Sequence, residues 1–245
     1  MFTTSVASDW FPTSVVFDCD GILLDSESLW RKAQQIVARD LDLTWSDELA
    51  EALHGSSTDQ VRRVFVEALV GADAPDATKR GQEQIVDTKL RTVAGEIFAS
   101  GIELIPGAKD VMEQLATVLP VAVASNSDRE TLEFKLSNYG YQQYVTTQVS
   151  ADDVEDPKPA PDMYLKAVQE LGGTPERALT FEDSVAGATA AQSAGTVTMI
   201  LTDSEAESRP EGNGYFDSFE DPEFRAQITR WVEAARAAQA DGSDG

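Results

Sequence analysis

The stretch that decides the fold is residues 15–21, Val-Val-Phe-Asp-Cys-Asp-Gly, where a short apolar run ends on two carboxylates and a glycine. The apolar run is typical of a buried strand. Because side chains alternate along an extended chain, Asp18 and Asp20 point to one side and Cys19 to the other. Two clustered carboxylates repel each other unless a cation or a shared proton lies between them, and Mg²⁺ prefers such oxygen ligands. Gly21 then allows a sharp turn. Alone, this string is equally typical of a plain turn or a calcium-type loop.

Composition limits the class of protein. The chain has 245 residues, of which 42% are hydrophobic, enough for one large globular domain or two unequal ones. The net charge is −24, from 19 Lys and Arg against 43 Asp and Glu, so we expect the surface to repel nucleic acid and anionic membranes. The same charge disfavours anionic substrates at long range, so a phosphate site would have to be locally positive.

Three features of the sequence bear on localisation and assembly. The chain has no apolar run long enough for a membrane span, and its first twelve residues do not resemble a secretory signal. A single cysteine rules out an internal disulfide and suits a reducing compartment, so we expect a cytoplasmic protein. The sequence does not give the oligomeric state; a monomer is favoured.

The order of periodic segments predicts an α/β fold. Residues 27–99 have helical spacing almost throughout. Beyond them, predicted helices cover 111–119, 132–139, 163–171, 186–194 and 224–238, and predicted strands cover 121–124, 144–149, 178–181 and 196–201. Residues 203–222 look loop-like, and 241–245 are expected to be disordered. The alternation predicts a doubly wound, Rossmann-like parallel sheet formed by residues 1–25 and 101–240, with residues 26–100 inserted as a helical cap domain.

Oxygen-bearing side chains follow three of the predicted strands. Asp18 and Asp20 follow the first, Ser125 and Asn126 follow residues 121–124, and Glu182 and Asp183 follow residues 178–181. Ligands of a doubly wound sheet bind at the carboxyl ends of its strands, so these groups should converge on one crevice. With Asp18, the Glu182–Asp183 pair could complete an oxygen cage for Mg²⁺. Two alternatives are that Ser125 merely ends its strand and that Asp183 or Ser184 merely caps the following helix.

Two further segments would bring donors to an anion. Ser127 and Glu130 have the spacing of a capping box, which predicts a helix start whose free amides face the crevice beside the Ser125 hydroxyl. Lys158 lies between Pro157 and Pro159, which stiffen the backbone around it and indicate a positioned charge. The alternative is a lysine on a proline-rich surface loop.

Taken in order, these segments resemble the haloacid dehalogenase superfamily, in its branch with a helical cap inserted after the first strand. The branch includes sugar phosphatases and β-phosphoglucomutase-like enzymes. The resemblance covers residues 14–201, and its motifs are the segments 18–26, 124–127, 158–159 and 181–184 with Gly187.

This resemblance implies a phosphatase that works through a phospho-aspartyl enzyme. Asp18 would be the nucleophile, and Asp20 would protonate the leaving oxygen and then deprotonate the attacking water. Ser125, Lys158 and amides near Asn126 would hold the phosphoryl group. Mg²⁺ would be bound by the Asp18 carboxylate, the Asp20 carbonyl and Asp183, with Glu182 bound directly or through water. The expected substrate is a small phosphorylated metabolite, a sugar or polyol phosphate.

The inserted helical segment would determine the substrate. His54, Gly55 and Thr58 occupy the place where such caps reach toward it, although His54 could equally be an ordinary residue of a cap helix. Mutase relatives often carry a histidine and an arginine where this chain has Trp30 and Thr58, which favours hydrolysis. A sugar phosphomutase therefore remains the nearest alternative, and a non-catalytic phosphate-sensing module is an alternative of another class. Trp30 and Cys19 are interpreted as packing residues.

Overall fold

The computed structural model describes residues 1–53, 58–99, 101–202 and 210–242. The chain forms two compact units. One unit combines Met1–Leu24 with Leu104–Gly245, and the other is Asp25–Glu103. Two short strands, β3 (Leu24–Asp25) and β4 (Glu103–Leu104), lie where the chain passes from one unit to the other, and they pair as a two-stranded sheet.

The first unit is built on a seven-stranded sheet in the order β1-β9-β8-β7-β2-β5-β6. Its strands are β1 (Thr3–Thr4), β2 (Ser14–Phe17), β5 (Val121–Ala124), β6 (Thr147–Val149), β7 (Ala178–Glu182), β8 (Val197–Leu201) and β9 (Gly214–Phe216). Between these strands, the pairings are parallel except that of β1 with β9. Every residue of β2, β5 and β7 is buried, as expected for parallel strands covered on both faces.

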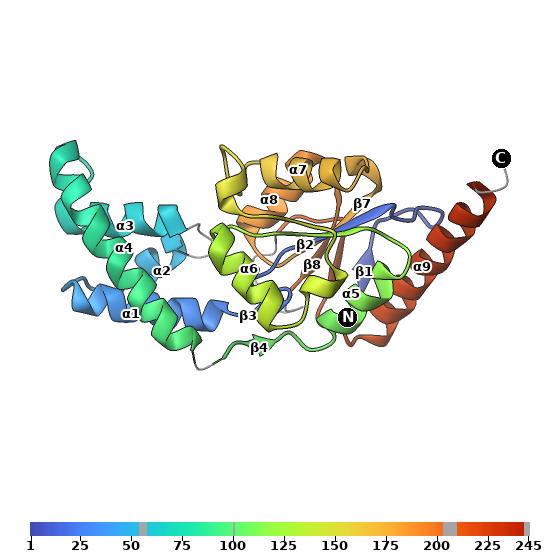
Figure 1. The fold of residues 1–245 in the computed structure, drawn as a ribbon, viewed down its shortest axis with the longest axis horizontal. Coiled ribbons are helices and arrows are strands. Elements are labelled where there is room, and N and C mark those ends of the chain that lie inside the picture. The colour runs from blue at the N-terminus through green and yellow to red at the C-terminus, as the bar shows by residue number, and fades with distance from the viewer. Residues whose placement is uncertain (54–57, 100, 203–209, 243–245) are drawn as a thin grey trace. The chain divides into compact units, whose positions relative to one another are not determined.

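Helices cover both faces of this sheet (Figure 1). α7 (Asp162–Glu170) and α8 (Val185–Ala194) pack against each other; α7 contacts β2, β5 and β6, and α8 contacts β7 and β8. α5 (Ala108–Ala116) contacts β5 and packs on α9 (Pro222–Gly242). α6 (Arg129–Asn138) follows β5, and short 3₁₀ turns cover Gln142–Tyr144, Ala151–Asp153 and Pro175–Arg177. The predicted α/β class with a mostly parallel sheet is therefore confirmed.

The second unit is helical, as the periodicity of residues 27–99 predicts. It contains α1 (Glu27–Asp40), α2 (Asp47–Leu53), α3 (Thr58–Val70) and α4 (Asp76–Phe98). α4 packs on α1 and α3 around a core that includes Val37, Phe65 and Val86. The Trp30 ring meets the Phe98 ring edge to face at 4.9 Å between centroids, which supports the interpretation of Trp30 as a packing residue.

Some predicted element boundaries are wrong. Residues 203–222 are not loop throughout, because Gly214–Phe216 forms β9, whose Phe216 is buried and stacks on Phe224. The strand predicted over 144–149 is shortened to Thr147–Val149, since Gln142–Tyr144 forms a 3₁₀ turn. α9 continues to Gly242, into the segment expected to be disordered. Among the described residues, no helix has the length and apolar character needed to cross a bilayer.

Candidate active site

Three neighbouring strands bring the predicted site residues to one edge of the sheet. β2 lies between β7 and β5, with Phe17 aligned to Phe181 on one side and to Val123 on the other. The residues that follow these aligned positions, Asp18, Glu182 and Ala124, therefore lie at the same edge of the sheet. The Asp18 amide donates to the Phe181 carbonyl at 3.0 Å, so the backbone at the end of β2 is still tied to β7. The sheet register thus places the segments after β2, β5 and β7 side by side.

Lys158 links the ends of β2, β5 and β7. Its Nζ lies 2.5 Å from Asp18 Oδ1, 2.7 Å from Glu182 Oε1 and 2.9 Å from the carbonyl oxygen of Ala124. The residue is only 3% exposed, so it is not a surface-loop lysine. The geometry therefore agrees with the expectation that Lys158 is a positioned charge close to Asp18. A buried ammonium at this place gives the site a fixed positive charge.

Asn126 holds the backbone of Lys158. The Lys158 amide donates to Asn126 Oδ1 at 3.1 Å, and Asn126 Nδ2 donates to the Lys158 carbonyl at 3.2 Å. The side chain of Asn126 is thus occupied in fixing the lysine. Its backbone amide is the group that the family resemblance assigns to the phosphate.

Glu182 is fully buried and both of its carboxylate oxygens accept hydrogen bonds. Oε1 accepts from Lys158 and from the Tyr164 hydroxyl, and Oε2 accepts from the backbone amides of Asp183 and Ser184 at 3.1 and 3.3 Å. The carboxylate lies against the first turn of α8, where the helix dipole favours a negative charge. A Cβ added to Gly187 would come 1.8 Å from Oε1, so glycine is needed there for the approach.

Asp183 brings a third carboxylate toward Asp18. Asp18, Glu182 and Asp183 each offer an oxygen, and these oxygens lie within 4.8 Å of one another. Gly21, at φ +85°, leaves room for Asp183, because a Cβ there would lie 1.8 Å from Asp183 Oδ2. The donor set is entirely hard oxygen, which fits Mg²⁺. The capping alternative also holds in part, since Ser184 Oγ accepts from the Gly187 amide and caps α8.

Asp20 lies on the other side of the site, toward β5 and α6. Its Oδ2 accepts from the hydroxyls of Ser125 and Ser127, each at 3.2 Å. Its Oδ1 is 2.5 Å from Nζ of Lys135, a fully buried residue of α6. The Asp20 carboxylate is not in the group of Asp18, Glu182 and Asp183, which is consistent with an expected metal contact through its carbonyl.

The electrostatics of the site follow from burial. Burial raises the pKa of Asp18 to about 7; the nearby Glu182 and Asp20 carboxylates add to this, and Lys158 opposes it. Burial lowers the pKa of Lys158, but Asp18 and Glu182 outweigh it, so the net shift is upward and the lysine stays charged. Burial also raises the pKa of the Cys19 thiol well above its usual value, which disfavours a nucleophilic thiolate.

The predicted capping box is wrong by one residue. Asp128 caps α6, its Oδ1 accepting from the Thr131 amide at 2.8 Å. The Ser127 hydroxyl instead contacts Asp20 and Lys135, so its hydrogen bonds are used in the site.

Sequence reasoning missed Lys135 and Tyr164. The sequence contains a pattern that could have identified each of them. Lys135 falls on the same helical face as the apolar Leu132 and Leu136, both fully buried, and a lysine in such a row needs a buried partner. Tyr164 lies on the buried face of α7 with Met163 and Ala167, where its hydroxyl also needs a partner.

The predicted substrate contacts are not tested by this geometry. His54 and Gly55 lie outside the described residues, and Thr58 is the first residue of α3 in the helical unit.

Comparison with known proteins points to one family. The sequence profile of the haloacid dehalogenase-like hydrolases matches residues 13–195. The fructose-1-phosphate phosphatase YqaB of Escherichia coli is 31% identical over 181 residues, covering 74% of this chain and 92% of the relative. A phosphorylated carbohydrates phosphatase of Thermotoga maritima is 29% identical over 184 residues, covering 74% and 81%.

A solved structure agrees with these relatives. The crystal structure of CbbY from Rhodobacter sphaeroides in complex with phosphate has a TM-score of 0.71 and 26% identity, covering 86% of this chain and 96% of that one. The resemblance inferred from the motifs is confirmed.

Proposed function

The chain belongs to the haloacid dehalogenase-like hydrolase family, and on that premise we propose that it hydrolyses phosphate monoesters of small sugars or polyols. The two relatives compared above are both named as phosphatases. The observation that carries the proposal is the pair of aspartates after β2. Asp18 is paired with Lys158, which also binds the buried Glu182, whereas Asp20 is paired with Lys135 and accepts from the hydroxyls of Ser125 and Ser127. Two carboxylates in two such different environments suit two different roles.

In the proposed reaction, the Asp18 carboxylate attacks phosphorus and the bond from phosphorus to the ester oxygen breaks. Asp20 gives its proton to the departing alkoxide, which leaves as the free alcohol. Water then attacks the phospho-aspartyl group, Asp20 accepts the proton, and inorganic phosphate leaves with Asp18 restored. Lys158 would neutralise charge on the phosphoryl oxygens throughout, which is where most of the rate enhancement of such reactions arises. The Ser125 hydroxyl, which donates to Asp20 in this structure, would orient these oxygens once it turns to them.

We propose that Mg²⁺ binds between Asp18 and Asp183, with the Asp20 carbonyl as a further ligand. Glu182 is close enough to contribute, although its oxygens already accept hydrogen bonds, so we assign it chiefly to holding Lys158. When bound, the metal would neutralise charge on the transferring phosphoryl group. Dialysis against EDTA should abolish phosphate release, and Mg²⁺ should restore it.

The substrate class rests on the relatives, which are named for phosphorylated sugars. We propose that the helical unit Asp25–Glu103 is the cap that selects the substrate, with His54, Gly55 and Thr58 among its contacts. The single cysteine, Cys19, is free and suits a cytoplasmic enzyme.

The test is phosphate release from a panel of sugar, polyol, glycolate and nucleotide monophosphates, with Asp18→Asn as the inactive variant. The exposed Asp9→Asn serves as the matched control. We expect release of inorganic phosphate by the wild type and the control, and none by Asp18→Asn. Isomerisation of a sugar phosphate without release would identify a mutase instead. Phosphate binding without turnover of any panel member would identify a sensing module.

A further inference from the structure

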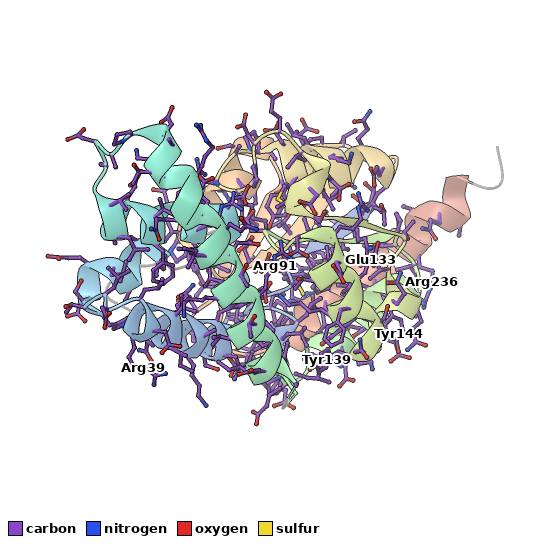
Figure 2. The ribbon with its side chains drawn as sticks, turned by 60° about the vertical axis from the view of Figure 1, so that its left-hand side comes forward. Arg39, Arg91, Glu133, Tyr139, Tyr144 and Arg236 are labelled. Atoms are coloured by element: carbon purple, nitrogen blue, oxygen red, sulfur yellow. The ribbon has the colours of Figure 1, made fainter. Side chains whose placement is uncertain are left out.

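Lys135 is a second buried lysine in the site, and no motif of the sequence assigns it a role. It lies on α6 and is fully buried, whereas Glu133 (labelled in Figure 2), two residues earlier on the same helix, is exposed. Burying an ammonium is costly unless it is paired and hydrogen-bonded. Its partners are Asp20 Oδ1 at 2.5 Å and Ser127 Oγ at 3.0 Å, so this buried charge is directed at Asp20.

Hydrogen bonds join the Asp20 carboxylate, Lys135 and Ser127 in one network. Lys135 binds Oδ1, and Ser127 joins Lys135 to Oδ2, to which Ser125 also donates. The carboxylate is therefore fixed in direction from three sides. It contacts side chains after β5 and on α6, and it is not one of the three carboxylates, Asp18, Glu182 and Asp183, whose oxygens lie within 4.8 Å of one another.

The carboxylates of the site fall into two groups, each with its own lysine. Lys158 forms ion pairs with Asp18 and Glu182, and Lys135 forms an ion pair with Asp20. Without Lys135, the Asp20 carboxylate would lose this charged partner, and the hydroxyls of Ser125 and Ser127 would hold it less firmly against the pull of a divalent cation beside Asp18. An acid–base group that ligates the metal cannot exchange a proton with the substrate. The orientation of the Asp20 carboxylate therefore decides whether it can act as the general acid and base.

We propose that Lys135 is a positioning residue for Asp20: with Ser127, it holds that carboxylate where the leaving oxygen and the attacking water arrive. The inference rests on the proposed function, because it concerns proton transfer in that reaction. It assigns Lys135 no contact with the substrate. Its effect should therefore be confined to steps in which Asp20 moves a proton.

The dependence of the rate on the leaving group distinguishes a positioning role from a purely structural one. A sugar alkoxide needs a proton as it departs, whereas p-nitrophenolate leaves without one. Phospho-enzyme formation from a sugar phosphate therefore depends on a correctly placed acid, and formation from p-nitrophenyl phosphate does not. Damage to the fold, to Asp18 or to the metal site would slow both reactions alike.

The experiment compares wild type, Lys135→Met and Asp20→Asn in single-turnover rapid quench with Mg²⁺. The two substrates are the best sugar phosphate of the panel and p-nitrophenyl phosphate. Lys166→Met is the matched control, since Lys166 is a half-exposed lysine of α7 with an ion pair to Glu170 at 3.8 Å. Lys135→Gln, which keeps a donor, is the second variant should the methionine variant fail to fold.

We expect Lys135→Met to slow release of the sugar by about 10- to 100-fold and the burst of p-nitrophenol by less than about threefold. In the Asp20→Asn background, the added Lys135→Met should cost nothing further, because the two residues act as one unit. Equal slowing of both substrates, or additive losses in the double variant, would refute the positioning role while leaving the phosphatase intact. A wild type without turnover, or an active Asp18→Asn, would overturn the proposed function and this inference with it.

Discussion

In the metal-free protein, Asp18→Asn should gain stability relative to the wild type as the pH rises. The site brings together the carboxylates of Asp18, Asp20, Glu182 and Asp183 against the buried lysines 135 and 158. Burial, with the repulsion of Glu182 and Asp20, raises the pKa of Asp18 from 3.8 to about 7. Asparagine has nearly the same shape and carries no charge, so it removes both this repulsion and the ion pair with Lys158, whose net effect is the raised pKa. Ionisation of Asp18, the proposed nucleophile, would thus lower the stability of the folded state.

The magnitude of this effect comes from proton linkage. The folded chain keeps a proton on Asp18 up to about pH 7, whereas the unfolded chain releases it near pH 4. Over this interval the folded state binds more protons, so the free energy of unfolding falls as the pH rises. One pKa unit is worth about 1.4 kcal/mol, and Asp18 is already half titrated at pH 7, so the interval from pH 5 to pH 7 corresponds to about 2 kcal/mol. The variant lacks this contribution, and its advantage over the wild type should grow by that amount.

The assay is urea denaturation of both proteins in EDTA at several values between about pH 5 and pH 8, with Asp9→Asn as control. Added Mg²⁺ should stabilise the wild type at the upper end and leave Asp18→Asn unaffected, because the metal needs the carboxylate. If the stability curves of wild type and Asp18→Asn run parallel with pH, the account of Asp18 is wrong.

The same contacts and charges support three other predictions. Gly187→Ala places a methyl group 1.8 Å from Glu182 Oε1, so Glu182 must shift together with Lys158. We expect it to lower the free energy of unfolding in urea by about 1–3 kcal/mol and to lose most phosphatase activity, with Ser193→Ala at an exposed position of the same helix as control. Tyr164→Phe removes a hydrogen bond to the buried Glu182 and should cost about 1–3 kcal/mol in the same titration. The net charge of −24 makes the folded chain repel itself, so raising NaCl from about 0.1 to about 1 M should raise the midpoint of thermal unfolding. An unchanged or lower midpoint would contradict this.

The α/β class and the strand ends could be predicted because they depend on local pattern. Val15, Val16 and Phe17 form a continuous apolar run that suits only a covered strand, and the acids after them have no packing role. The same logic identified the segments after β5 and β7. Neighbouring parallel strands then place those segments together whatever the detail of the loops.

Two kinds of feature could not be predicted in this way. β9 has only three residues and forms because β8 and β1 offer backbone partners on either side, which no local pattern reveals. The capping-box prediction was wrong for a similar reason, since Ser127 has two possible partners and the site supplies the stronger ones, Asp20 and Lys135. Hydrogen-bond donors and charges take the partners that the fold brings within reach.

Apolar periodicity and residue type are properties of the chain alone, and they were enough to identify which side chains carry chemistry and which strands deliver them. How those side chains divide the work depends on their positions in three dimensions. The folded chain sets Lys158 between Asp18 and Glu182, turns Asn126 onto the lysine backbone, and pairs Asp20 with Lys135, which lies 115 residues away in the chain. The reason is that a buried charge must find a partner in space, and distance along the chain does not limit that choice.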